Sequence, residues 1–130
     1  MNPADKILVI QDSPLINAML KSRLESADFL VETAETGEEG LTKVLAASYR
    51  LILLDYKLPG MDGNQVCRIL KGKTETKDVP VVFLSGQDEK QLAALVKETG
   101  AQGYITLPFQ GEALVRSVRE FIAGHGQQIL

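Results

Sequence analysis

The sequence predicts an α/β fold in which a five-stranded parallel sheet is doubly wound with five helices. Five short apolar runs alternate along the chain with five amphipathic stretches. The connections between them are short, as expected when strands and helices alternate and the helices cover both faces of the sheet. The chain has 130 residues, of which 45% are hydrophobic, so it can bury one core and has the length of one domain.

Five strands are expected where compact apolar runs occur, because a strand that is covered on both faces reads as a continuous apolar segment. The clearest run is Lys-Ile-Leu-Val-Ile at 6–10, and the run at 51–54 ends abruptly at Asp55. Pro80 should lie at the beginning of the fourth strand, where a missing N–H is tolerated. The expected strands are 6–10, 29–34, 51–54, 79–84 and 103–107.

Five helices are expected from apolar stripes at spacings of three and four and from capping residues. Ser13 and Pro14 offer an N-cap and a first-turn proline for the first helix, and Thr36 with Glu39 forms a capping-box signature for the second. The predicted stripes of these two helices are Ile16, Met19, Leu20 and Leu24, and then Leu41, Val44 and Leu45. The helices are expected to begin near 14, 36, 62, 88 and 111. The second should run through Leu45, and the others should end near 27, 72, 99 and 123.

Composition and charge exclude several classes of protein. The formal net charge of −3, from 14 basic and 17 acidic residues, gives no general attraction to nucleic acid or to an anionic membrane. The longest apolar runs are far shorter than the roughly 18 residues of a membrane span, and the N-terminus lacks a secretory pattern. One cysteine allows no intrachain disulfide framework. We therefore expect a cytoplasmic domain. The charged residues Lys71, Lys73, Lys77 and Asp78 are expected to form a solvated loop.

Polar residues follow the predicted strands at their carboxyl ends, where ligands bind in open α/β sheets. Asp12 follows the first strand, Asp55 ends the third, Ser85 and Gly86 follow the fourth, and Thr106 lies in the fifth. Carboxylate oxygens suit Mg²⁺, which commonly takes one or two of them together with water and phosphate oxygens. The sequence therefore predicts a magnesium site at this edge.

Each of these residues also has a purely structural interpretation. Asp12 before Ser13 is typical of a helix cap, Asp55 of a turn former, and Ser85 before glycine of a turn. Only their joint placement at one edge of the sheet favours a functional site.

Three segments resemble the receiver domain of two-component response regulators. Residues 55–63, Asp-Tyr-Lys-Leu-Pro-Gly-Met-Asp-Gly, look like the family's phosphoacceptor and the loop after it, and 83–86 and 103–109 are similar to its fourth and fifth strands. The resemblance covers about 6–123. It implies a flavodoxin-like (βα)5 receiver fold, a single domain over 1–130 with a tail at 124–130, and a signalling role rather than an enzymatic one.

Residue by residue, the resemblance implies a phosphoryl-transfer site. Asp55 would take a phosphoryl group from a phosphohistidine on a histidine kinase or phosphotransfer protein. Asp12, Asp55 and the backbone carbonyl of Lys57 would hold Mg²⁺. Ser85 would hydrogen-bond the phosphoryl group, and Tyr104 would be the aromatic that turns inward, although Tyr104 is also typical of an interior aromatic. Such a reaction needs positioning and neutralisation of charge more than covalent help.

Two residues depart from the family pattern. Gln11 replaces the first acid of the usual pair, which should weaken Mg²⁺ binding because one negative charge is missing. Leu107 replaces the lysine that supplies a cation to the phosphoryl group, and losing one such contact costs on the order of 10²–10³ in rate. Two hypotheses follow: an atypical receiver that is phosphorylated at Asp55, or a pseudo-receiver that binds partners independently of phosphorylation.

Two other classes fit less well. Haloacid-dehalogenase-type phosphatases also begin with an aspartate after an apolar strand, but they need a second acid two residues later, where this chain has Lys57. A flavodoxin-like cofactor binder would need a Ser/Thr-rich phosphate loop after the first strand, and the chain has neither that loop nor a tryptophan to stack on a flavin.

The family's fourth helix, fifth strand and fifth helix commonly contact partners, here 88–99, 103–106 and 111–123. This face is a candidate to bind a downstream effector or, as a homodimer, a second copy of the chain, although its apolar residues are equally consistent with ordinary core packing. No output domain is expected within the 130 residues that end at Leu130, so effects should pass to another chain or a further segment. Cys67 is expected to be a buried core thiol. His125, in the tail, has little support as a phosphorelay or metal residue.

Overall fold

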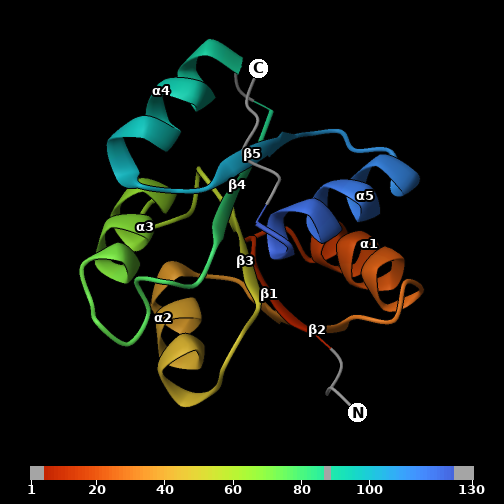
Figure 1. Ribbon diagram of the computed structural model, residues 1–130, viewed down its shortest axis with the longest axis horizontal. Helices are drawn as coiled ribbons and strands as arrows, with labels where there is room; N and C mark the ends of the chain where they lie inside the picture. Colours follow the sequence, from red (N-terminus) through yellow and green to blue (C-terminus); the bar gives the residue numbers. More distant parts are fainter. Residues whose placement is uncertain (1–4, 87–88, 125–130) are drawn as a thin grey trace.

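The computed structural model describes residues 5–86 and 89–124, and Figure 1 shows a single central sheet. All four strand pairings are parallel and the spatial order is β2-β1-β3-β4-β5. The strands are β1 (Lys6–Ile10), β2 (Leu30–Ala34), β3 (Leu51–Asp55), β4 (Val81–Ser85) and β5 (Gly103–Thr106). The predicted fold class is confirmed, and the reversal of strand order falls between β1 and β3.

Helices cover both faces of the sheet. In Figure 1, α1 and α5 lie on one side, and α2, α3 and α4 lie on the other. The helices are α1 (Pro14–Glu25), α2 (Gly37–Ala46), α3 (Gly63–Lys71), α4 (Glu89–Thr99) and α5 (Gly111–Ile122). None of the helices within the described residues combines the length and apolar character that crossing a bilayer requires.

Alternate residues of the strands feed two apolar cores. Leu8 and Ile10 of β1 pack towards α2, α3 and α4, whereas Ile7 and Val9 pack towards α1 and α5. All four side chains are fully buried. This arrangement explains why the strands read as continuous apolar runs rather than as alternating ones.

Two residues of the predicted stripes turn out to be exposed. Met19 on α1 is 50% exposed and Leu45 on α2 is 62% exposed. The buried stripe of α1 instead consists of Asn17, Leu20 and Leu24. Met19, two residues after Asn17, therefore points away from the sheet because successive helical residues are rotated by about 100°.

The helix caps follow the prediction with two differences. The Ser13 hydroxyl accepts from the N–H of Ile16 at 3.3 Å, and Thr36 accepts from the N–H of Glu39 at 3.0 Å. The Glu39 carboxylate, however, accepts from the N–H of Glu35 rather than from that of Thr36, so the capping box is displaced by one residue. Gly72, which its place after the third apolar stripe favours as a C′ glycine, is instead the C-cap of α3, with a right-handed φ of −87° that any residue can adopt.

Other strand and helix ends differ from the expected ones by a few residues. β2 begins at Leu30 and β4 at Val81, after Pro80, while β5 ends at Thr106, before Leu107. Helices α1 and α5 end at Glu25 and Ile122, slightly earlier than expected. Asp88, the expected start of α4, and His125 lie outside the described residues.

Lys71 does not belong to a solvated loop. Its side chain is half-buried, and the ammonium donates to the carbonyls of Lys77 at 3.1 Å and Val79 at 2.9 Å. A third hydrogen bond, of 3.2 Å, reaches the side-chain oxygen of Gln102. Burial lowers the pKa of Lys71 below its usual value. The exposed positions predicted for Lys73, Lys77 and Asp78 are confirmed.

Candidate functional site

The carboxyl ends of four strands meet at one edge of the sheet. The register pairs Ile10 with Leu54, Asp55 with Leu84, and Ser85 with Thr106. Parallel pairing therefore brings Asp55, Ser85 and the segment that follows β1 to the same edge. This edge lies beside the reversal of strand order, which is where ligands bind in open α/β sheets.

Asp55 is a half-buried carboxylate with a perturbed pKa. Burial at the end of β3 and, to a smaller extent, the charge of Asp12 raise the pKa of Asp55 to about 6. Hydrogen bonds from the backbone N–H groups of Lys57 and Tyr56 oppose this shift. No lysine or arginine is among the described residues that act on this pKa. The site therefore holds concentrated negative charge that a cation would relieve.

Gln11 is part of this site, because its side chain contacts Asp55. It is 97% buried, with only 3% of its surface exposed. Its side-chain oxygen accepts from the N–H of Ser13 at 3.1 Å, and its side chain also hydrogen-bonds Asp55, which lowers the pKa of that carboxyl. The amide thus donates to the carboxylate, which an acid in the same place could do only when protonated.

Asn17 holds the backbone of Gln11 in place, and the sequence-based interpretation missed it. Its side-chain nitrogen donates to the carbonyl of Gln11 at 2.7 Å. Asn17 is buried, and its side-chain oxygen has no hydrogen-bond partner among the described residues. The one sequence feature that could have indicated this role is a polar residue, Asn17, directly beside Ile16 of the predicted apolar stripe.

The loop between β3 and α3 is closed by a contact that requires glycine. The N–H of Gly63 donates to the carbonyl of Tyr56 at 2.8 Å. A Cβ at Gly63 would collide with the backbone oxygen of Asp55 and would lie 2.8 Å from the Cα of Tyr56. Asp62 and Gln65 form a complete capping box at the start of α3. The loop that carries Lys57 is thereby held against the end of β3.

Ser85 and Leu107 lie on neighbouring segments. Ser85, the last residue of β4, is 4% exposed, and its carbonyl accepts from the N–H of Leu107 at 2.9 Å. The Leu107 side chain packs against the core on the α1 and α5 side, and the peptide bond to Pro108 is cis. Leu107 therefore contributes apolar contact where a lysine would contribute charge.

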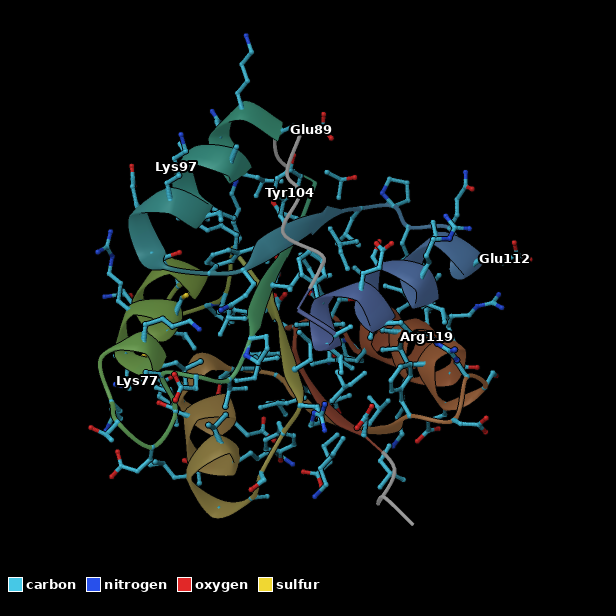
Figure 2. The ribbon with its side chains drawn as sticks, in the orientation of Figure 1. Lys77, Glu89, Lys97, Tyr104, Glu112 and Arg119 are labelled. Carbon is cyan, nitrogen blue, oxygen red and sulfur yellow. The ribbon has the colours of Figure 1, made fainter. Side chains whose placement is uncertain are left out.

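Tyr104 lies on β5 beside the start of α4. Figure 2 places it close to Glu89. Burial, and to a smaller extent the charge of Glu89, raises the pKa of Tyr104. The ring is partly buried and packs against the core on the α2, α3 and α4 side. Cys67 is fully buried, as predicted, and burial raises its pKa.

Two carboxylates, Asp12 and Asp55, form the acidic part of the site within residues 5–86 and 89–124. Within the described residues, no group of three or more histidine, cysteine, aspartate or glutamate side chains could hold a metal. Asp12 is exposed and Asp55 half-buried, and the charge of one acts on the other. Two oxygen donors at a partly wet edge fit Mg²⁺, which usually keeps several waters and binds through one or two carboxylates.

A parallel sheet in this order, covered by helices on both faces, is a doubly wound flavodoxin-like fold. The chain belongs to the response regulator receiver domain family, whose model matches residues 7–119. It is 36% identical over 117 residues to the transcriptional regulatory protein ResD of Bacillus subtilis. That match covers 90% of this chain and 48% of ResD, so the chain spans about half the length of this relative.

Solved structures show the same fold. The chemotaxis protein CheY4 of Vibrio cholerae is 28% identical with a TM-score of 0.86, and the match covers 91% of this chain and 98% of CheY4. A receiver domain of a sensor histidine kinase from Pseudomonas aeruginosa, 22% identical with a TM-score of 0.85, matches 93% of this chain and 99% of that one. That domain was solved with a magnesium ion coordinated in its active-site cleft.

Proposed function

We propose that this receiver domain accepts a phosphoryl group on Asp55 from a phosphohistidine of a histidine kinase or phosphotransfer protein. The observation that carries the proposal is the position of Asp55: a half-buried carboxylate at the end of β3, next to Asp12, in a receiver domain. No other described acid lies at a strand end with a second carboxylate acting on it.

The chemistry follows from the carboxylate. An Asp55 oxygen attacks phosphorus, the P–N bond of the phosphohistidine breaks, and the nitrogen keeps the electron pair. Because the other ring nitrogen of that histidine carries a proton, the products are an acyl phosphate and a neutral imidazole. Asp12, Asp55 and the backbone carbonyl of Lys57 would hold Mg²⁺, which would neutralise charge on the phosphoryl oxygens. We assign to Ser85 a hydrogen bond to one of those oxygens.

The same proposal includes an output. Tyr104, partly buried between β5 and α4, would turn inward when Ser85 engages the phosphoryl group and would change the surface formed by α4, β5 and α5. That surface would then bind a downstream effector or a second copy of the chain in the cytoplasm.

Phosphate incorporation from acetyl phosphate tests the proposal directly. We expect incorporation in the presence of Mg²⁺ and none for Asp55→Asn. Asp28→Asn is the matched control, because Asp28 is an exposed carboxylate outside the site with a φ of 73° that asparagine tolerates. Absence of incorporation in the parent chain, or equal incorporation in Asp55→Asn, would refute the proposal.

A further inference from the structure

A cleft between α1 and α5 has no role in the receiver site. It has a volume of about 430 Å³ and lies on the face of the sheet opposite α2, α3 and α4. Ala27 and Val115 provide apolar lining. None of its lining residues is Asp12, Asp55, Ser85 or Tyr104, so whatever it binds is bound apart from the phosphoacceptor.

Arginine side chains dominate the cleft. Three of the chain's five arginines, Arg23, Arg116 and Arg119, line it, together with a single carboxylate, Glu112. The guanidinium groups of Arg23 and Arg116 form no hydrogen bond or ion pair with any residue in 5–86 or 89–124. On a chain with a net charge of −3, this is a local excess of positive charge with unused donors.

Two of the guanidinium groups are held in place. A Cβ at Gly111 would lie 2.5 Å from Nε and 2.8 Å from Nη2 of Arg23, so the guanidinium of Arg23 packs directly on the backbone at the start of α5. Arg119, placed in Figure 2 on the side of α5 that faces α1, donates to the carbonyl of Ala27 at 3.3 Å and stacks over the ring of Phe29. Donors that are already ordered lose less entropy when a ligand binds.

The neighbouring cleft is not equivalent. It has a volume of about 450 Å³ and also includes Arg119, together with Arg50. Two carboxylates, Asp5 and Asp28, line it as well, and Asp5 pairs with Arg50 at 3.5 Å. Its charges therefore balance, whereas three guanidinium groups face one carboxylate in the first cleft. An anion would bind in the first.

We propose that the α1–α5 cleft binds a phosphate-bearing small molecule of nucleotide size. Planar guanidinium groups match the oxygens of a phosphate through paired hydrogen bonds, which assigns the phosphates to Arg23 and Arg116, whose donors are unused. Glu112 accepts an N–H donor of the ligand, such as the exocyclic amine of a base, and Ala27 with Val115 contacts its apolar part. The cleft volume lies in the range of small-ligand sites.

Calorimetric titration of the full chain with ATP, pyrophosphate and adenosine, at low salt and without divalent metal, tests the proposal. Omitting the metal keeps the phosphates away from the acidic edge, so the result is independent of whether Asp55 can be phosphorylated. We expect ATP to bind more tightly than pyrophosphate, and adenosine to show no measurable binding. Arg116→Ala should weaken ATP binding about tenfold, since it removes charge-assisted hydrogen bonds.

Arg68→Ala is the matched control, because Arg68 is an exposed arginine on α3 whose guanidinium bonds Asn64 away from the cleft. It should leave ATP binding unchanged, and amide NMR shifts should gather at 23–27 and 111–119. Three results would overturn the proposal: no binding of ATP at millimolar concentration, equal weakening by the two arginine variants, or shifts that gather at Asp12 and Asp55. Equal affinities for ATP and pyrophosphate would remove the roles given to Glu112 and the apolar lining.

Discussion

The side chain of Gln11 hydrogen-bonds the carboxylate of Asp55 and accepts from the N–H of Ser13 with its oxygen. The two residues come from adjacent strands, β1 and β3, whose pairing ends at Ile10 and Leu54. A neutral donor thus stands where the family usually has an acid. It lowers the pKa of Asp55, which burial and Asp12 raise, but it contributes no charge to bind a metal.

Replacing Gln11 with aspartate should have opposite effects with and without metal. The added charge should tighten Mg²⁺ binding by on the order of tenfold, because cation and carboxylate attract strongly at contact. Without metal the variant should be less stable than the parent, since three like charges then share one edge and a donor is lost. Calorimetry with Mg²⁺ and urea unfolding measure the two effects. Gln91→Asp adds the same charge at an exposed position of α4 and should change neither the Mg²⁺ affinity nor the stability. Unchanged Mg²⁺ affinity in Gln11→Asp would contradict the assignment of the Mg²⁺ site to this edge of the sheet.

Leu107→Lys should accelerate phosphorylation of Asp55. A cation at this position would compensate the charge of the phosphoryl group, and one preorganised contact of this kind is worth on the order of 10²–10³ in rate. The backbone N–H of residue 107 is held by the carbonyl of Ser85 at 2.9 Å, so the new side chain starts from a defined place. The rate of phosphate incorporation from acetyl phosphate is the measurement. Leu107→Gln removes the same apolar contact without adding charge, and equal rates for the two variants would show that charge at 107 does not limit the reaction.

Gly63→Ala should destabilise the domain by about 1–3 kcal/mol, the usual cost of forcing extra atoms into a packed site. The new Cβ would meet the backbone of Asp55 and Tyr56, which cannot move away as a side-chain tip could. Urea unfolding measures the change. Gly86→Ala, whose nearest contact would be the Leu107 oxygen at 3.8 Å, should cost less than about 0.5 kcal/mol. A similar loss of stability in both variants would mean that the close backbone approach at Gly63 does not require glycine there.

Lys71→Ala should lower the free energy of unfolding by about 1–3 kcal/mol, because it removes the side-chain donor to the carbonyls of Lys77 and Val79. The side-chain oxygen of Gln102 would keep only the N–H of Val81 as a donor. Lys73→Ala, at an exposed position two residues away, should change it by less than about 0.5 kcal/mol. Chemical unfolding of both variants decides between a structural lysine and a solvated one.

Glu32 should make stability depend on pH. The Tyr49 hydroxyl, at 2.6 Å, and the ammonium of Lys6, at 3.2 Å, hold the pKa of Glu32 below its usual value of 4.5. The folded chain therefore binds this proton less tightly than the unfolded chain, so the contribution of Glu32 is present above pH 4.5 and is lost as the pH falls through its lowered pKa. Glu32→Gln should be less stable than the parent at pH 7, and the difference should shrink on going to pH 4. A difference that is constant with pH would exclude this linkage.

The sequence was sufficient to predict the sheet. The five predicted strands are confirmed within two residues at each end. The signal is strongest for β1, β3 and β4, because burial on both faces leaves a short continuous apolar run bounded by polar and turn residues. Asp55 could be identified for the same reason: a charged residue that directly follows such a run must lie at the edge of the sheet. Caps at Ser13 and Thr36 were equally readable, since they depend on residues only three apart.

Only the tertiary structure decided which side of each helix meets the sheet and what meets across elements. Met19 and Leu45 are exposed because the buried stripes of α1 and α2 are rotated from those that apolar spacing suggests. The contact of Gln11 with Asp55, the three acceptors of Lys71 and the gathering of Arg23, Arg116 and Arg119 all join residues from different elements. Local sequence patterns report the periodicity of one element at a time, whereas these contacts are set by how neighbouring strands align and how α1 and α5 pack together.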